Sequence, residues 1–293
     1  MGPRWGFGPV FANEWLTTSR RWQVYAGRAL FVAALLVGLW SVWVSRTSGQ
    51  TVPIHLLAEI GEGFFNAIVF TQLSLVVLAA PAATAGTICQ DRSSGRLAQL
   101  LATDLSDAEI VLGKLGARLV PVVGLVACAL PVLAICVLMG GVDPLALAGA
   151  FLITVCLGIF ACALALAFSV WAAKPYEAIL ATYAFFMVWL LAIPTWDNLG
   201  RHWGFPTSPD WLIWSHPFYL AVAPYVQPGK VGVLDYLAFG AAMLISSSAL
   251  LALVIGRMRA VVAAEGDRYA SRLAARGVLG MSTVSQRTGL RVR

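Results

Sequence analysis

The pair Gly113-Lys114 is the first candidate for nucleotide chemistry in this sequence. A phosphate-binding P-loop has the pattern G-x-x-x-x-G-K-[ST], in which backbone amides and the lysine hold the phosphates. Here Leu115 stands where the hydroxyl residue is required, and Ala108 stands where the first glycine is required. We therefore expect no catalytic residue and no cofactor in this chain. If ATP and Mg²⁺ drive the protein, a partner subunit binds them.

Histidine and cysteine do not form a hydrolase or metal-binding pattern. Neither H-E-x-x-H nor G-x-S-x-G occurs, so zinc-dependent and serine-dependent hydrolysis lack a basis. His55, Glu59 and Glu62 could share one helical face that suits a metal, but such a face is more often simply solvated, and we expect no metal there. We also expect the cysteines to be small buried apolar residues without a disulfide or metal role. The cysteines are Cys89, Cys128, Cys136, Cys156 and Cys162.

The composition indicates that a lipid bilayer is the solvent of this chain. Of its 293 residues, 59% are hydrophobic and only 12% are charged, whereas soluble domains carry about 25% charged residues. The net charge of +6 is better explained by an unequal distribution of basic residues between the two membrane sides than by nucleic-acid binding.

Six apolar runs approach the roughly 20 residues that a membrane-spanning helix requires. Because backbone polar groups in lipid must be satisfied internally, each run is predicted to be a helix. The fold class is therefore an all-α polytopic membrane protein, with one transmembrane domain (1–256) and a basic cytoplasmic tail (257–293) that rests on anionic headgroups. The predicted spans are 27–44, 64–86, 119–139, 145–173, 178–195 and 231–255.

The distribution of Lys and Arg predicts the orientation. With the N-terminus in the cytoplasm, all but three of the 20 basic residues lie on the inner side, and the exceptions are Arg46, Arg201 and Lys230. We expect a multi-pass protein of the inner (plasma) membrane with both termini cytoplasmic.

The first residues lack the features of a signal peptide. Residues 7–22 are predicted to form an amphipathic helix in the inner interface, although a partly ordered tail is the alternative.

The outer connection 196–230 is rich in tryptophan and proline. Its part Trp211–Val226 is apolar but too short and too interrupted by proline to span the membrane. We expect it to lie in the outer interface or to be re-entrant. It either caps the exit path or serves only as an aromatic anchor.

A charged stretch, Thr87–Leu119, interrupts the apolar runs on the inner side. Leu97, Leu100 and Leu101 have the i, i+3, i+4 spacing of an apolar helical stripe. Ser106 and Glu109 have the spacing of a capping box, so a helix is predicted to start near Asp107 and to run into the third span. An ordinary solvated loop is the alternative.

This stretch resembles the signature of permease subunits of type-2 ABC transporters, roughly E-R-x-x-G-T-L-E-x-L-L-x-T-P-L-S followed by I-V-x-G-K. Asp91 replaces the usual Glu, and Arg96, Ala98 and Asp104 replace Thr, Glu and Pro. The residues that match in type and spacing are Arg92, Gly95, Leu97, Leu100, Leu101, Thr103, Leu105, Ser106, Ile110, Val111, Gly113 and Lys114.

The resemblance implies a permease subunit of an ATP-driven transporter of the exporter group. It implies a coupling helix near 91–103 that docks on a separate ABC ATP-binding subunit, and a second permease copy in the membrane. Membrane lipid is the other expected partner, and nucleic acid is not expected. The predicted coupling residues are Asp91, Arg92, Gly95, Arg96, Leu97, Leu100, Leu101, Thr103, Ser106 and Lys114. Of these, Leu97, Leu100 and Leu101 would form the docking stripe.

The spans carry mild polarity and no ionisable residue near their centres, which counts against a proton- or sodium-coupled carrier. Asn66, Gln72, Ser246 and Ser247 are candidates to line the transport path, although hydrogen bonding between packed helices is the simpler interpretation.

Two alternatives from other classes remain: a six-span membrane scaffold or assembly factor that transports nothing, and an intramembrane enzyme. The enzyme is disfavoured because no buried acid, histidine or reactive cysteine motif is present. The sequence does not select a substrate.

Overall fold

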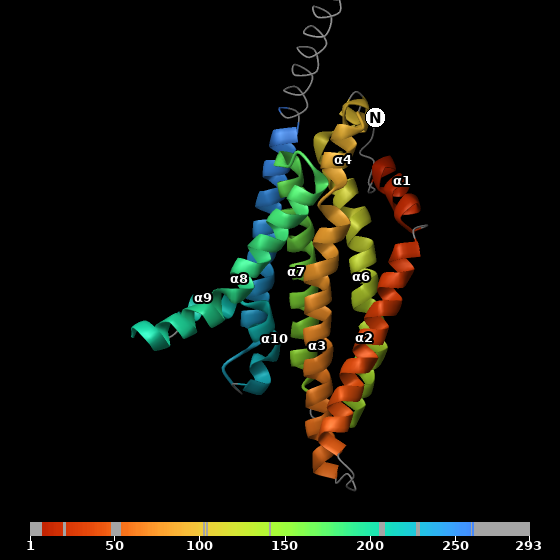
Figure 1. The fold of residues 1–293 in the computed structure, drawn as a ribbon. Helices are drawn as coiled ribbons and strands as arrows, with labels where there is room; N and C mark the ends of the chain where they lie inside the picture. Colours follow the sequence, from red (N-terminus) through yellow and green to blue (C-terminus); the bar gives the residue numbers. More distant parts are fainter. Residues whose placement is uncertain are drawn as a thin grey trace, which may run out of the picture.

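The computed structural model describes residues 8–19, 22–47, 54–101, 103, 105–140, 142–204, 209–226, 229–258 and 260. All regular structure in these residues is helical, and six helices are long and apolar enough to cross a membrane. The prediction of an all-α polytopic membrane protein is therefore confirmed. The helices (Figure 1) are α1 (Gly8–Ser19), α2 (Trp22–Thr47), α3 (Ile54–Thr84), α4 (Thr87–Ser93), α5 (Arg96–Leu101), α6 (Asp107–Met139), α7 (Pro144–Trp171), α8 (Pro175–Trp203), α9 (Asp210–Ser215), α10 (Pro217–Val226) and the last helix, Val233–Met258.

The helices α3 and α7 form the centre of the bundle. The α7 helix is apolar around its whole circumference and mostly buried, as expected for a helix surrounded by others. The α3 helix packs against α2, α6 and α7. In contrast, α2, α8 and the last helix expose most of their apolar side chains. The core therefore lies along α3 and α7, and the peripheral helices leave apolar faces for lipid or for another chain.

Most of each predicted span lies on one of these helices, but the bounds differ. Residues 85–86, 172–173 and 231–232, at the ends of three predicted spans, lie outside the helices. The α3 helix begins at Ile54, ten residues before the predicted span at Phe64, and near this end Glu59 pairs with Arg46 of α2 at 3.2 Å. The α8 helix continues past 195 to Trp203 with Pro194 inside it, and Gly204 ends it in the left-handed conformation (φ +73°). The helix therefore extends into the predicted outer connection 196–230, and the position of the membrane boundary along it stays a prediction.

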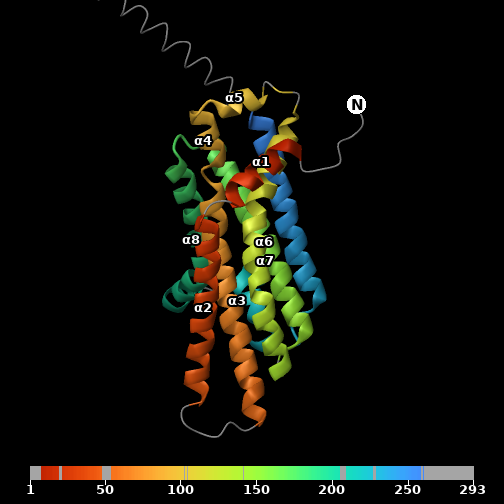
Figure 2. The ribbon, with the colours of Figure 1, turned by 90° about the vertical axis from the view of Figure 1, so that its right-hand side faces the viewer.

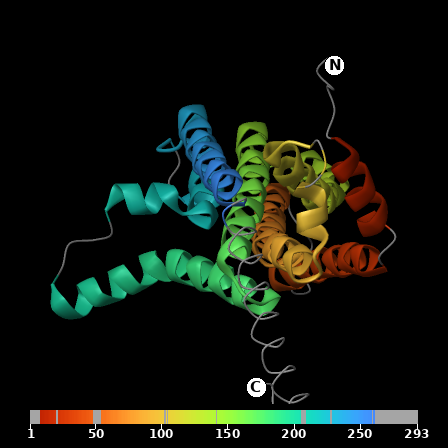
Figure 3. The ribbon, with the colours of Figure 1, turned by 90° about the horizontal axis from the view of Figure 1, so that it is seen from above.

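The second half of α8 diverges from the bundle, and α10 returns to it (Figures 1 and 3). The α10 helix has ten residues, so it is about 15 Å long and cannot cross a hydrocarbon core of about 30 Å. This confirms that the segment Trp211–Val226 does not span. It forms two short helices, and α10 packs against α7 and α3. The hydroxyl of Tyr225 accepts a hydrogen bond from the Asp143 backbone N–H at 3.1 Å.

The charged stretch forms an elbow, which we define as α4, α5 and the connection to α6. It lies at one end of the bundle, together with α1 (Figure 2). The sequence predicted one short helix here, but the structure has two. Gly95 separates them with φ +74°, a backbone conformation that ends a helix and that side chains with a Cβ rarely adopt.

The start of α6 agrees with the predicted capping box. The Ser106 hydroxyl accepts a hydrogen bond from the Glu109 N–H at 3.2 Å, and the Glu109 carboxylate accepts one from the Ser106 N–H at 2.9 Å. The helix then runs without interruption from Asp107 to Met139, through Pro121 and Pro131. The capping box thereby fixes where the elbow ends and the long helix α6 begins.

Replacing Ser106 with alanine is expected to lower the free energy of unfolding by about 1 kcal/mol, because one N–H at the start of α6 loses its acceptor. The thermal unfolding midpoint of the purified protein in detergent measures the effect. Ser106→Thr keeps the hydroxyl and is the control that should retain most of the stability. Equal midpoints for Ser106→Ala and the unchanged protein would contradict the capping role.

Predictions that fall on residues 1–7, 20–21, 48–53, 102, 104, 205–208, 227–228, 259 and 261–293 lie outside the described residues. This applies to most of the basic tail, to residues 7, 20 and 21 of the predicted interface helix 7–22, to parts of the outer connection and to Asp104.

Candidate functional site

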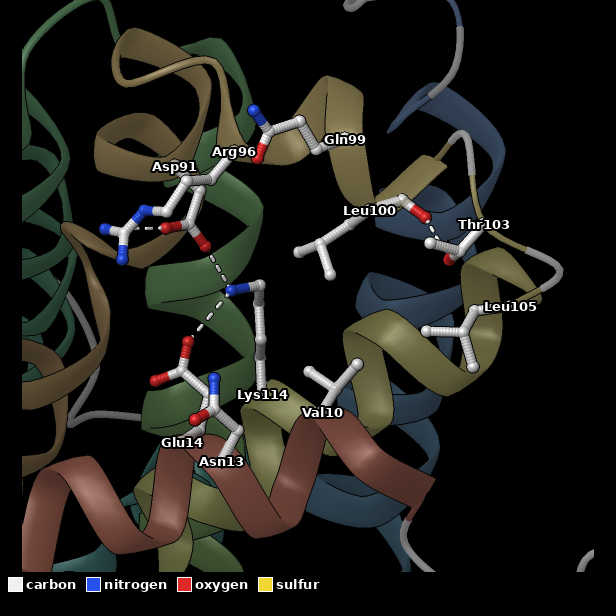
Figure 4. A pocket seen from close by; sticks show the side chains of 10 residues that line it. All are labelled: Val10, Asn13, Glu14, Asp91, Arg96, Gln99, Leu100, Thr103, Leu105 and Lys114. Carbon is white, nitrogen blue, oxygen red and sulfur yellow. Dashed lines mark hydrogen bonds and ion pairs between the residues drawn. The ribbon is translucent and has the colours of Figure 1, made fainter.

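Lys114 lies at the centre of a group of charged side chains at the elbow end of the bundle (Figure 4). Its ammonium group contacts the Glu14 carboxylate of α1 at 3.1 Å, and it also pairs with the Asp91 carboxylate of α4. The Lys114 side chain is only 1% exposed. A buried ammonium group without counter-charges would be strongly destabilising, and these two carboxylates supply the counter-charges.

One arginine extends the group at each end. The Arg96 guanidinium pairs with Asp91 at 3.1 Å, and the Arg118 guanidinium pairs with Glu14 at 3.1 Å. The result is an alternating ion-pair chain: Arg96, Asp91, Lys114, Glu14 and Arg118. These residues come from α1, α4, α5 and α6, so the ion-pair chain joins these four helices.

Opposing effects act on the pKa of Glu14. Burial raises this pKa, whereas the positive charges of Lys114, Arg118 and Arg96 and the hydrogen bond from Lys114 lower it, and the net result is a pKa below the ordinary value of 4.5. A lowered pKa means that folding favours the carboxylate. Its stabilising contribution is complete above pH 4.5 and is lost as the pH falls through the folded-state pKa.

Arg92 connects the elbow to α7. Its guanidinium donates hydrogen bonds to the backbone carbonyls of Val170 at 2.8 Å and Ala172 at 2.7 Å. The last carbonyls of a helix have no partner within the helix, and a basic side chain is one of the groups that can satisfy them. The Cys89 N–H also donates to the Ser169 hydroxyl at 3.1 Å. The elbow is thus held against the C-terminal end of α7 by contacts from two residues of α4.

A cavity of about 460 Å³ lies between α1, the elbow and the start of α6. Apolar side chains and the inner members of the ion-pair chain line it together (Figure 4). The lining residues are Val10, Asn13, Glu14, Asp91, Arg96, Gln99, Leu100, Thr103, Leu105 and Lys114. Arg96, Gln99 and Thr103 are also exposed at the surface of the elbow, so this surface is polar and carries a positive charge.

The family model described as ABC-2 family transporter protein matches residues 20–226, which include the elbow and the first five spanning helices. The chain belongs to the ABC-2 transporter family. The resemblance found in the charged stretch is thereby confirmed, and together with the six apolar helices it supports a multi-pass membrane permease of an ABC transporter. A comparison with curated proteins gives no match.

In this permease the predicted docking stripe is not uniformly exposed. Leu97 is 1% exposed and packs in the main hydrophobic core, so it does not lie on the surface in this arrangement, and its role in docking stays a prediction. Leu100 is half-buried at the cavity, and the side chain of Leu101 lies outside the described part of the chain. An apolar stripe on a short helix is buried more favourably against the protein's own core than left exposed, which explains the difference.

The remaining residues of the predicted coupling set divide into two groups. Asp91 and Lys114 are buried in the ion-pair chain, and Arg92 donates hydrogen bonds to α7. These three residues therefore contact other parts of the permease, and their part in coupling stays a prediction. Four residues of the set are exposed, and for them a contact with a partner stays a prediction. The exposed residues are Gly95, Arg96, Thr103 and Ser106.

Neither Arg118 nor Glu14 was among the predicted coupling residues, and Glu14 is the harder of the two to predict. It is 100 residues from Lys114 along the chain, and no local pattern connects the two. The sequence showed only that it is an acidic residue on the polar side of an amphipathic segment. Gln99 is exposed and lines the same cavity as Arg96, and it too was not among the predicted coupling residues.

The predicted path-lining residues occupy different environments in the permease. Gln72 and Ser247 are 3% and 2% exposed, Asn66 is half-buried and Ser246 is exposed. The hydroxyls of Ser246 and Ser247 donate to carbonyls one turn earlier in the same helix, at 2.7 and 2.6 Å. These bonds satisfy the hydroxyls locally, and a role of the four residues in a transport path stays a prediction.

Proposed function

We propose that this permease is the membrane subunit of an ABC exporter whose elbow docks on a separate ATP-binding subunit. ATP and Mg²⁺ bind to that partner, because the sequence of the permease has no phosphate-binding loop. The observation that carries the proposal is that the elbow is joined to three spanning helices. It follows α3 after a turn at residues 85–86, continues into α6 through the capping box, and is held to α7 by Arg92.

These connections suit the transmission of force from outside the membrane. A partner that displaces the elbow displaces the ends of α3, α6 and α7 with it, and transport requires such a displacement between two discrete arrangements. The exposed surface formed by Arg96, Gln99 and Thr103 provides the polar contact area. The basic residues support a cytoplasmic location of this end, because the positive-inside rule places them there.

A second copy of the permease completes the proposed transporter, giving twelve spanning helices around one path. The exposed apolar side chains on α2 and α8 support this pairing, because they offer faces that a second chain or lipid must cover. Among them are Leu36 and Val37 on α2, and Leu180, Met187 and Val188 on α8.

Replacing Leu100 with aspartate is expected to leave the permease inserted in the membrane but to reduce co-purification of the ATP-binding subunit at least tenfold. The new carboxylate would stand at the cavity beside Asp91 and Glu14, and repulsion between like charges would displace the elbow surface. The measurement is affinity purification of the tagged permease, co-expressed with ABC ATP-binding subunits encoded by neighbouring genes.

Leu100→Met is the matched control, because it keeps an apolar side chain of similar volume and should retain the partner. Retention of the ATP-binding subunit by Leu100→Asp would contradict the docking assignment. If no ATP-binding subunit associates even with the unchanged permease, the scaffold interpretation is favoured instead.

A further inference from the structure

We propose that Lys114 is a positioning residue that fastens both α1 and the elbow to α6, so that these elements move as one rigid body. The inference rests on the proposed function, because it concerns how motion of the elbow reaches the rest of the permease. It goes beyond docking, since Lys114 is buried and cannot reach a partner protein in this arrangement.

The position of Lys114 suits this role. It lies in α6 two turns after the capped start at Asp107, and its ammonium group is the only cation of the ion-pair chain that contacts both carboxylates. Glu14 belongs to α1 and Asp91 belongs to α4. Removing the charge of Lys114 therefore breaks the ion pair between α4 and α6 and one of the two ion pairs between α1 and α6, of which the other joins Glu14 to Arg118. Loss of either arginine leaves both ion pairs of Lys114 in place.

Gly113, the residue before Lys114, allows α1 and α6 to pack closely against each other. A Cβ atom added at Gly113 would lie 3.3 Å from the Phe11 backbone nitrogen and 3.3 Å from the Val10 Cβ. The absence of a side chain thus allows the backbone of α1 to lie directly on α6. Val10 and Thr18 are buried, as expected if α1 is held against the bundle along its length. Gly113 sets the close approach of α1, and Lys114 fixes its position by charge.

The role of Lys114 in positioning α1 and the elbow explains why the charged side chains of Glu14, Asp91 and Lys114 occupy this region. Apolar side chains would pack there at a lower desolvation cost. Apolar contacts alone allow α1 to slide along α6, because such contacts have little directional preference. An ammonium group between two carboxylates fixes both partners to one point. We infer that positional precision, rather than net stability, is what the ion-pair chain supplies.

A distance measurement on the full-length permease in lipid nanodiscs tests the proposal. Spin labels are attached to Thr17→Cys on α1 and Ser93→Cys on α4, both at exposed positions. Cys128 is replaced by alanine, because it is the one cysteine of the five, all of them described, that is not buried. The expected result is one narrow distance distribution, which Lys114→Met broadens at least twofold. A distribution that stays narrow in Lys114→Met would overturn the proposal.

Two further variants make the result independent of a folding failure. The triple variant Glu14→Gln, Asp91→Asn and Lys114→Met removes the three central charges together, so neither carboxylate is left without the ammonium group. The amide oxygen introduced by Glu14→Gln can still accept a hydrogen bond from Arg118. This variant should also broaden the distribution. Glu59→Gln is the matched control, because it removes a carboxylate from the exposed pair with Arg46 on α2 and α3 and should leave the distribution unchanged. A narrow distribution in the triple variant would equally overturn the role of Lys114.

The assembled complex gives a second, functional readout. With the ATP-binding subunit bound, the distance between the two labels should be the same without nucleotide and after trapping with ADP and vanadate. A distance that differs between these states would show that α1 and the elbow are not one body. Failure of the proposed function would be distinguishable: the ATP-binding subunit would not co-purify, while the labels on the permease alone would still respond to Lys114→Met.

Discussion

Replacing Arg92 with methionine is expected to reduce the free energy of unfolding of the permease by about 3 kcal/mol. Hydrogen bonds that involve a charged group contribute about 1.5–3 kcal/mol each, and Arg92 donates two, to the carbonyls of Val170 and Ala172. Methionine keeps the apolar part of the side chain but leaves both carbonyls at the end of α7 without this donor. Thermal unfolding of the purified protein measures the loss.

Arg46→Met is the matched control, because Arg46 is 48% exposed and pairs with an exposed Glu59. Exposed ion pairs contribute about 0–1 kcal/mol, so this variant should unfold close to the unchanged protein. Similar losses in the two variants would mean that Arg92 contributes only as a surface charge, and the attachment of the elbow to α7 would then have to depend on other contacts.

Replacing Gly149 with leucine is expected to prevent the last helix from packing against α7, and to cost about 3 kcal/mol or more. A Cβ atom at this position would lie 2.6 Å from the Cε2 and Cζ atoms of the Tyr236 ring. Tyr236 is 2% exposed, so its ring has no free space into which it can turn. The yield of monodisperse protein in detergent, together with its unfolding midpoint, measures the effect.

Gly256→Leu is the control for the glycine substitution itself, because a Cβ atom there meets nothing within 4 Å. It should retain yield and stability. The smaller change Gly149→Ala should be destabilising in the same direction, and Tyr236→Leu should partly rescue it by removing the ring. If Gly149→Leu purifies as well as Gly256→Leu does, the close contact between α7 and the last helix is not required for folding.

The spanning helices could be predicted from the sequence because the bilayer imposes one requirement on every residue of a span. Backbone groups must be paired internally and side chains must be apolar, so length and composition suffice. The start of α6 could be predicted for a different reason: the capping box involves only Ser106 and Glu109, which are three residues apart. Both features are local, and local features leave a pattern in the sequence.

The features that could not be predicted depend on which elements meet in three dimensions. The stripe containing Leu97 was recognised correctly as apolar, but periodicity does not state whether an apolar face packs on the protein's own core or on a partner. The pairing of Glu14 with Lys114 joins α1 to α6 across 100 residues, and a carboxylate on an amphipathic helix does not identify its partner. Gly95 was part of a recognised motif, yet the break that it makes between α4 and α5 follows from its φ of +74°.

The ion-pair chain is unequally exposed along its length, and this determines how it responds to ionic strength. Arg96 is 66% exposed at one end, whereas Lys114 in the middle is 1% exposed. Dissolved salt screens solvent-exposed charges strongly and buried pairs much less. Concentrated salt therefore weakens the ion pair between Asp91 and Arg96, while the ion pairs of Lys114 persist. A high-salt wash would thus change the exposed surface of the elbow without displacing α1 from α6.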